Sequence, residues 1–217
     1  EMARVRKQAG AKELLYSHAP LVVLDNYEHK GKWQEVFPSV QPLEIEIGMG
    51  RGNFILEKAR QNPDKNFLGI EVIEEIINEA IERMEQKGGV PDNLRFIWMN
   101  AQNVADIFAP NEVSKIYLNF SDPWPKNRHR KRRLTHSNFL KQYREILTPD
   151  GFLEQKTDSR GLFEFSLNEL AAEDWRFQKI ALDLYENLPE DNIATEYEEK
   201  FVKRGLPIYY LKTQNRK

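Results

Sequence analysis

Cysteine is absent from this chain of 217 residues, histidine is scarce, and no long apolar run occurs. The lack of cysteine excludes disulfides, thiolate metal sites and thiol nucleophiles, and it suits a reducing cytoplasm. The four histidines are scattered without metal-ligand spacing, so we expect no metal. No apolar run approaches the length of a membrane span and no signal-peptide core is recognisable, so we expect a cytoplasmic protein without membrane association. We take Met2 as the natural first residue and Glu1 as an addition.

An even distribution of charge is also missing. The formal net charge is −2, yet six of the eight residues in Lys126–Arg133 are Lys or Arg. Without that run, 26 basic residues face 34 acidic ones, and Asp183–Glu199 holds seven acidic and no basic residues. Residues 1–12 are expected to form a mobile basic arm. A mainly acidic chain with one dense basic run is typical of a protein that contacts a polyanion at one place.

The hydropathy pattern predicts one α/β domain over residues 1–217. Alternating strands and helices imply parallel crossover units, hence a doubly wound, mostly parallel sheet. The last two strands have no clear helix between them and suit an antiparallel edge. In such sheets, ligands bind where the winding reverses, at the carboxyl ends of the strands. Strands are expected at residues 42–48, 66–72, 94–99, 115–120, 151–157, 176–184 and 207–213, with a helix after each of the first five.

The first predicted strand ends in a glycine-rich turn, "EIGMGRGNF". Glu46 precedes Gly48, Gly50 and Gly52, and glycines allow a sharp turn and close approach of the backbone to a ligand. Dinucleotide loops read G-x-G-x-x-G, with the third glycine where this chain has Asn53. The shifted glycine and the leading carboxylate suit a cationic nucleoside ligand without phosphate, such as S-adenosylmethionine. An ordinary turn between strand and helix is the alternative.

Polar side chains also follow the next two predicted strands. Glu71 closes "LGIEV", where a carboxylate can accept both ribose hydroxyls of a nucleoside. Dinucleotide and adenosylmethionine sites share such an acid, so it supports nucleoside binding without choosing between them. Asn100 follows the third strand and could pair with an adenine edge, or equally well cap a helix.

The fourth predicted strand leads into "NFSDPWP". Pro123 biases Asp122 towards an extended backbone, and Pro125 stiffens the far side of Trp124. A rigid loop with a carboxylate and an aromatic face suits a planar base, although a plain proline-bounded turn is the simpler interpretation. The basic run that follows would neutralise several phosphates of a nucleic acid. A run of charges is usually just a solvated face, but that interpretation does not explain why this run directly follows the loop.

At these residues the chain resembles a known family. The segments "YLNFSDPWPKNRHRKRRL", "EIGMGRGNF", "KTDSRGLFEFS" and "TEYEEKF" resemble bacterial tRNA (guanine-N7-)-methyltransferases, in the same order, from about Arg4 to Tyr210. The D-P-W-P-K loop followed by R-H-x-K-R-R is the most specific part. The resemblance implies a class I adenosylmethionine-dependent fold that methylates the variable-loop guanine of tRNA. Monomer and homodimer both remain open.

The resemblance also implies roles for individual residues. Glu46, Glu71, Asn100 and Asp122 would bind the cofactor, and Asp122 would be catalytic. Lys126, Asp158, Thr195, Glu196, Tyr197 and Glu198 would contact the substrate, and Arg128, His129, Arg130, Lys131, Arg132 and Arg133 would contact RNA.

Several of these positions also have simpler interpretations. Asp158 or Ser159 could be a helix N-cap, and Thr195 with Glu198 matches a capping box. The chain departs from the family at three positions. Many members have aspartate where this chain has Asn100, asparagine is usual at the position of Ser159, and an apolar residue stands at the position of Gln155. These departures affect details of the substrate pocket and leave the reaction unchanged.

Two other classes compete with a methyltransferase. One is a nicotinamide-dependent oxidoreductase, against which the glycine spacing argues. The other is a non-enzymatic RNA-binding protein with a nucleotide-binding fold, against which the intact set of strand-end carboxylates argues. Binding of adenosylmethionine or of a dinucleotide separates the three.

Overall fold

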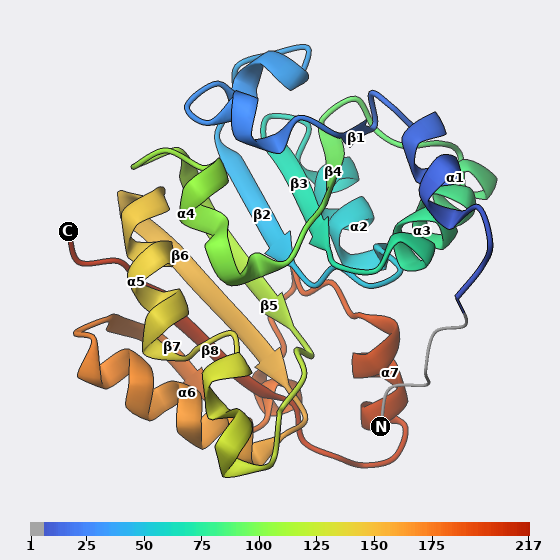
Figure 1. Cartoon of the computed structure of the whole chain (residues 1–217). Helices are drawn as coiled ribbons and strands as arrows, with labels where there is room; N and C mark the ends of the chain where they lie inside the picture. Colours follow the sequence, from blue (N-terminus) through green and yellow to red (C-terminus); the bar gives the residue numbers. More distant parts are fainter. Residues whose placement is uncertain (1–6) are drawn as a thin grey trace.

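Eight strands form one sheet in the computed structural model, which describes residues 7–217 (Figure 1). Their order is β1-β4-β3-β2-β5-β6-β8-β7. The strands are β1 (Val22–Val23), β2 (Leu43–Ile47), β3 (Asn66–Glu71), β4 (Leu94–Trp98), β5 (Val113–Asn119), β6 (Leu147–Thr157), β7 (Arg176–Ala181) and β8 (Tyr209–Gln214).

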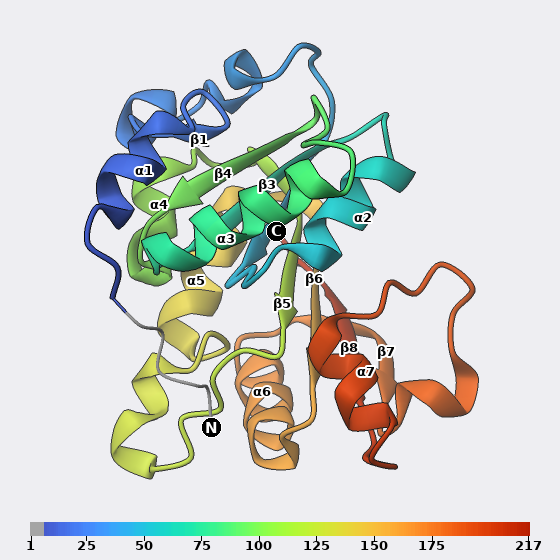
Figure 2. The same ribbon diagram turned by 90° about the vertical axis from the view of Figure 1, so that its right-hand side faces the viewer.

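Helices lie on both sides of this sheet (Figures 1 and 2). The α-helices are α1 (Ala11–Ser17), α2 (Asn53–Gln61), α3 (Glu74–Gln86), α4 (Val104–Ile107), α5 (Ser137–Ile146), α6 (Arg160–Ala172) and α7 (Glu196–Val202). Short 3₁₀ helices are η1 (Asn26–His29), η2 (Trp33–Val36), η3 (Ala101–Asn103), η4 (Asn127–Arg132) and η5 (Leu184–Asn187).

The predicted doubly wound, mostly parallel sheet with an antiparallel edge strand is confirmed. From β2 the chain winds through β3 and β4 to one side and returns to β5 on the other. Strand β8 lies between β6 and β7 and is antiparallel to both. The sequence pattern missed two elements: the two-residue β1, and α7 between the last two strands.

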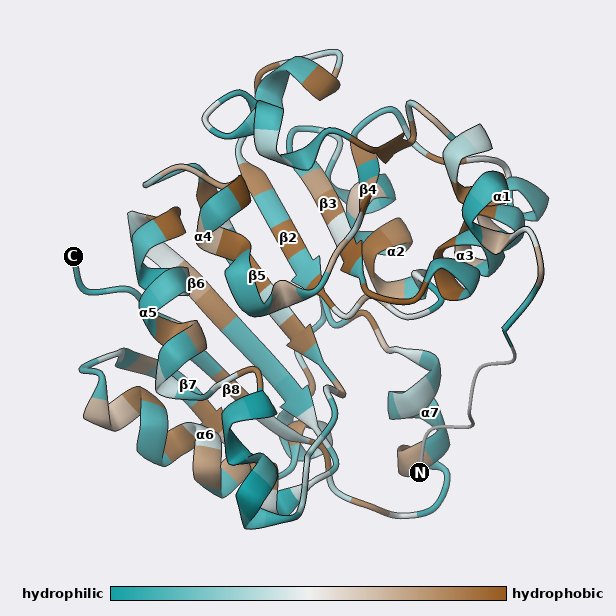
Figure 3. Ribbon diagram, in the orientation of Figure 1, coloured by the Kyte–Doolittle hydropathy of each residue, from teal (hydrophilic) through white to brown (hydrophobic). Residues whose placement is uncertain are grey.

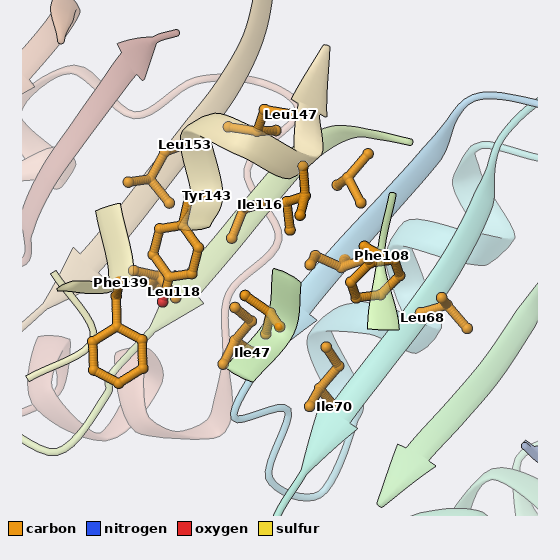
Figure 4. Close-up of a cluster of buried hydrophobic side chains, with 14 of the residues drawn as sticks. Ile47, Leu68, Ile70, Phe108, Ile116, Leu118, Phe139, Tyr143, Leu147 and Leu153 are labelled. Carbon is orange, nitrogen blue, oxygen red and sulfur yellow. The ribbon is translucent and has the colours of Figure 1, made fainter. Parts of the chain in front are cut away.

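Two hydrophobic clusters hold the layers together. The larger one packs the apolar faces of α4, α5 and α6 against β2, β3, β5 and β6. Figure 4 labels ten of its side chains, among them Phe139 and Tyr143 of α5 beside strands β2, β3, β5 and β6. The smaller one packs α1, α2 and α3 against β3 and β4. The brown faces of these helices in Figure 3 point towards the sheet, as expected for amphipathic helices. Among residues 7–217, no helix could span a membrane.

Strand β2 shows how an alternating pattern can mislead. Its sequence, LEIEI, predicts one apolar face and one solvated face. All five residues are nevertheless buried. Glu44 accepts a hydrogen bond of 2.5 Å from the Tyr117 hydroxyl and forms an ion pair with Lys65 at 3.3 Å. The glutamates of β2 are therefore internal groups.

The predicted basic arm, residues 1–12, falls partly outside the described residues, because 1–6 are not among them. Within the rest, α1 already begins at Ala11, which is buried. The Asn78 amide donates to the Ala11 carbonyl at 2.8 Å, and the Gln8 amide donates to Glu75 at 3.2 Å. The described end of this segment is thus held against α3.

Candidate active site

The reversal of winding between β2 and β5 gathers the predicted site residues at one edge of the sheet. Parallel pairing sets Ile47 beside Ile70, and Glu71 beside Trp98. The carboxyl ends of β2, β3, β4 and β5 therefore meet at the same edge, visible in Figure 1 above the label α7. Glu46, Glu71, Asn100 and Asp122 follow or close these four strands.

The glycine turn after β2 is shaped by backbone conformations that favour glycine. Gly48 and Gly50 have φ values of 76° and 54°, and a Cβ added at either would meet no atom within 4 Å. Open space beside these two positions leaves room for a ligand close to the backbone. A Cβ at Gly52 would lie 2.4 Å from the Met84 side chain. Gly52 therefore permits close packing of α2 on α3 and does not face that space.

Glu71 ties the glycine turn to the next strand. Its carboxylate accepts hydrogen bonds from the backbone amides of Gly50 at 3.1 Å, Val72 at 2.8 Å and Ile73 at 3.2 Å. Burial raises the pKa of Glu71 although these donors oppose the shift, and the negative charge of Asp122 raises it further. The carboxylate is held rigidly at the place where the sequence expects a ribose-binding group.

Glu46 is the most perturbed acid of the site. Burial raises its pKa from 4.5 to about 8, and the charge of Glu71 adds to the shift, whereas a hydrogen bond from Asn119 and the charge of Lys156 oppose it. The Asn119 amide donates to one carboxylate oxygen at 3.2 Å. The other oxygen is buried and has no hydrogen-bond partner among the described residues. Such an orphaned acceptor beside open space suits a ligand that brings a donor or a positive charge.

Asn100 and Asp122 differ in how firmly they are held. Asn100 accepts a hydrogen bond of 3.0 Å from the Gln102 amide and so caps η3, which is the alternative that the sequence left open. The side chain of Asp122 is exposed, and no hydrogen bond or ion pair joins it to another described residue. Partial desolvation nevertheless raises the pKa of Asp122. Asp122 is available to contact a ligand.

The loop that follows Asp122 is braced by part of the basic run. Trp124 has a φ of 43°, a strained value for a bulky residue. Arg133 donates to the carbonyl oxygens of Pro123 at 3.1 Å and Trp124 at 3.0 Å. The guanidinium of Arg132 lies 4.8 Å from the Trp124 ring centre. Arg133, predicted to contact RNA, thus holds the loop in shape.

The other basic side chains of the run surround η4. Lys126, Arg128, Arg130 and Lys131 are exposed, and η4 appears in deep teal in Figure 3. Desolvation and the positive charges of nearby Arg132, Arg128 and Lys126 lower the pKa of His129. This surface lies at the same edge of the sheet as Asp122.

The segment between β6 and α6 separates two roles that the sequence could not distinguish. Ser159 accepts from the Leu162 amide at 3.2 Å and is the N-cap of α6. Asp158 makes no such contact and is exposed. Asp158 therefore remains a candidate ligand contact, whereas Ser159 has a capping role.

Residues 195–198 also divide into residues that cap or support a helix and residues that could contact a ligand. Thr195 and Glu198 form a complete capping box at the start of α7. Glu198 is fully buried, and it accepts from Lys156, Tyr185 and Asn192 at 2.9, 3.0 and 3.0 Å. These bonds make Glu198 a support for the segment, with no exposed surface for a ligand.

The two residues between them face outward from this support. Glu196 accepts from Asn53 at 2.6 Å and Arg83 at 2.8 Å, which links α7 to α2 and α3. Tyr197 is exposed and stacks on Phe120 with ring centres 6.3 Å apart. Tyr197 is thus the residue of this segment with a free aromatic face near the strand ends.

Two residues of the site lie within segments that resemble the family, but the sequence assigned them no role. Asn119 is the last residue of β5 and contacts Glu46, and Lys156 lies beside it on β6. Lys156 is buried and donates to Asn192, to the Ile193 carbonyl and to Glu198. Their position, three residues before Asp122 and two before Asp158, together with their place in these segments, is the signal that could have singled them out.

Together, Glu46, Glu71 and Asp122 place three carboxylates beside a glycine turn. The charge of Glu71 raises the pKa of Glu46 and the charge of Asp122 raises the pKa of Glu71, and a bound cation would relieve that repulsion. Residues 7–217 contain no group of three His, Asp or Glu residues placed to hold a metal ion. The geometry therefore suits an organic cation of nucleoside type.

The fold is shared with solved methyltransferases. The 16S rRNA methyltransferase KamB matches with a TM-score of 0.64 at 13% identity, over 86% of this chain and 94% of KamB. An antibiotic-related methyltransferase matches with a TM-score of 0.61 at 17% identity, over 88% of this chain and 94% of that one. The architecture is that of a class I methyltransferase.

Sequence relatives identify the family. A model described as a putative methyltransferase matches residues 40–211. A tRNA (guanine-N(7)-)-methyltransferase from Lysinibacillus sphaericus is 46% identical over 212 residues, 97% of each chain. Proteins of the same name from Lachnoclostridium phytofermentans and Bacillus subtilis are 47% and 43% identical over 209 and 206 residues, covering 96% and 95% of this chain and 96% of each relative. The chain belongs to the tRNA (guanine-N(7)-)-methyltransferase family.

Proposed function

We propose that this protein transfers a methyl group from S-adenosylmethionine to N7 of a guanine in the variable loop of tRNA. The observation that carries the proposal is the group of carboxylates Glu46, Glu71 and Asp122 at the strand ends, with the basic η4 turn beginning five residues after Asp122. A cationic donor and a polyanionic substrate would thus bind side by side. The names of relatives that match nearly the full chain support the same activity.

The residues present fit the donor. Gly48 and Gly50 leave space for close approach, Glu71 can accept from ribose hydroxyls, and Glu46 has a buried oxygen without a partner for a positive group. Asn100 can still present its side-chain amide nitrogen to adenine while its oxygen caps η3. When bound, S-adenosylmethionine supplies an activated methyl group on a positively charged sulfur.

The chemistry asks for orientation more than for proton transfer. Guanine N7 displays a lone pair and carries no proton, so no general base is required at that atom. Positive charge moves towards the purine during transfer, and a carboxylate beside the base stabilises that charge. Asp122 is assigned this role, since it is exposed at the end of β5. Asp158 is the second candidate.

The tRNA would be held on two sides. Arg128, Arg130 and Lys131 on η4 grip the backbone, because their side chains are exposed. Lys126 and Tyr197 reach towards the base from the loop and from α7. A guanine engaged in tertiary pairing has to be opened locally, and phosphate contacts supply the binding energy for this step.

One experiment tests the reaction. Unmodified tRNA is incubated with the protein and a methyl-labelled donor, and the labelled nucleotide is mapped. We expect 7-methylguanine in the variable loop. Label at another base, or none with folded tRNA and saturating donor, would contradict the proposal. Calorimetry with adenosylmethionine and with a nicotinamide dinucleotide provides the control for the competing enzyme class.

A further inference from the structure

A second group of basic residues lies on the sheet face opposite to α5 and α6. A pocket of about 240 Å³ opens there, between α2, the strands β5, β6 and β8, and the segment from Leu184 to Ile193. Figure 2 shows this segment and α7 in front of β7 and β8. The pocket is lined by five lysines, which we call the lysine groove: Lys58, Lys115, Lys156, Lys179 and Lys212.

Only two of these lysines are neutralised within the fold. Lys115 pairs with Glu154 at 2.6 Å and Lys156 with Glu198 at 2.9 Å. Within residues 7–217, Lys58, Lys179 and Lys212 form no ion pair, and Asp191 is the one other acid of the lining. The groove thus keeps an excess of positive charge in a protein that is acidic elsewhere.

The remaining lysines repel one another. Lys179 on β7 and Lys212 on β8 are direct cross-strand partners, and like charges at such positions destabilise a sheet. Burial lowers the pKa of Lys58 and the positive charge of Lys115 lowers it further, whereas the charges of Glu154, Glu44 and Asp191 oppose the shift. Glu154, the partner of Lys212 on the other neighbouring strand, is already paired with Lys115, and a bound anion would reduce the repulsion between Lys179 and Lys212.

Aromatic rings fix where these ammonium groups lie. Lys58 is 5.5 Å from the Tyr117 ring centre, Lys179 is 5.8 Å from Tyr210, and Lys212 is 4.5 Å from Phe152. Cation–π contacts of this kind hold the charges in place without neutralising them. The groove is therefore a positioned set of donors and not a row of freely moving side chains.

The groove also adjoins the active site. Asn119 lines it, pairs with Lys156 in the sheet and donates to Glu46. Directly after Asn119 the chain enters the Asp122 loop and then η4. A chain of phosphates that leaves η4 and passes the strand ends would reach the groove next.

We propose that the lysine groove is a second contact for the phosphate backbone of the tRNA, on the far side of the active site from η4. The proposal rests on the proposed function, since it assumes that tRNA is the substrate. A contact between two copies of the chain is disfavoured, because a two-fold axis would set this positive surface against itself.

The test removes the two facing lysines. Lys179→Gln with Lys212→Gln should weaken tRNA binding at least about tenfold at 0.1 M salt and make the plot of log affinity against log salt less steep by about 2. Donor affinity should not change. Lys32→Gln with Lys141→Gln removes the same charge at exposed positions outside the groove and should leave both quantities unchanged.

Three outcomes contradict the proposal in different ways. If the wild-type protein does not bind tRNA, the proposed function fails and the groove contact fails with it. If the wild type methylates tRNA and the groove variant keeps the wild-type affinity and salt slope, only the groove contact fails. If pyrophosphate binds to the wild type and not to the groove variant, while tRNA binding is equal in both, the groove is a site for a small anion.

Discussion

The Asn119 amide donates a hydrogen bond of 3.2 Å to the Glu46 carboxylate at the point where β2 and β5 separate. The last backbone pairing between these strands joins Glu46 and Tyr117, two residues before Asn119. The contact therefore bridges the two directions of winding, at the place where α/β sheets bind ligands. It joins the acid expected to meet the donor to the strand that leads to Asp122.

Glu46 should make stability depend on pH. The pKa of Glu46 is about 8 in the folded protein, against a usual value of 4.5 that applies to the unfolded chain. Between pH 4.5 and pH 8 the folded state therefore retains a proton that the unfolded state has lost. Stability should therefore fall as pH rises from 4.5 to 8. Urea unfolding of wild type and Glu46→Gln should show the wild type losing stability relative to the variant over this range. A difference independent of pH would show that Glu46 is ionised at neutral pH.

Glu71→Ala should weaken donor binding by a free energy on the order of 1.5–3 kcal/mol, the cost of losing a charged hydrogen-bond acceptor. The glycine turn should also loosen, because the Gly50 amide loses its acceptor. Calorimetry measures the donor affinity, and Glu71→Gln, which retains one oxygen acceptor, is the matched control with a smaller loss. Unchanged affinity in a folded Ala variant would remove Glu71 from the donor site.

The basic run should show two kinds of behaviour. Changing Arg128, Arg130 and Lys131 together to Ala should weaken tRNA binding and flatten its dependence on salt, with donor affinity preserved. Arg133→Ala should instead lower the transfer rate with a smaller change of salt slope, because its guanidinium holds the carbonyls of Pro123 and Trp124. Identical salt slopes for the triple variant and the wild type would show that these three residues do not contact the phosphates of the tRNA.

Asp122→Ala should lower methyl transfer by at least about a hundredfold, the scale of one well-placed electrostatic contact. Binding of tRNA should change much less, because phosphate contacts dominate affinity. Single-turnover transfer at saturating donor and tRNA is the measurement, with Asp122→Asn as the isosteric control and Asp158→Ala for comparison. A near-normal rate for Asp122→Ala together with a slow Asp158→Ala would transfer the electrostatic role to Asp158.

Glu198→Ala should destabilise the fold by about 3–5 kcal/mol, since it leaves the buried ammonium of Lys156 without its partner. Urea unfolding measures this loss. Replacing both residues, with Lys156→Met and Glu198→Leu, should recover much of it, because no uncompensated charge remains. A mild effect of the single change would mean that Asn192 and the Ile193 carbonyl suffice to hold Lys156.

The fold could be predicted because its signals are local. Strand-like runs alternate with helical patterns, and this order alone implies parallel crossover units and a switch point. The antiparallel edge was visible as two strands without a clear helix between them. The insertion of β8 between β6 and β7 was not, because strand order at an edge depends on contacts between distant segments.

The sequence by itself determined which residues gather at the carboxyl edge, since a motif that follows a strand stays at the end of that strand. It could not separate ligand contacts from supports. Only the tertiary structure decided that Glu198 is enclosed, that Arg133 braces the Asp122 loop, and that Gly52 packs against Met84. Burial and hydrogen-bond partners arise from segments far apart in the chain. A sequence motif identifies a candidate residue, and the packing around that residue decides whether its side chain can contact a ligand.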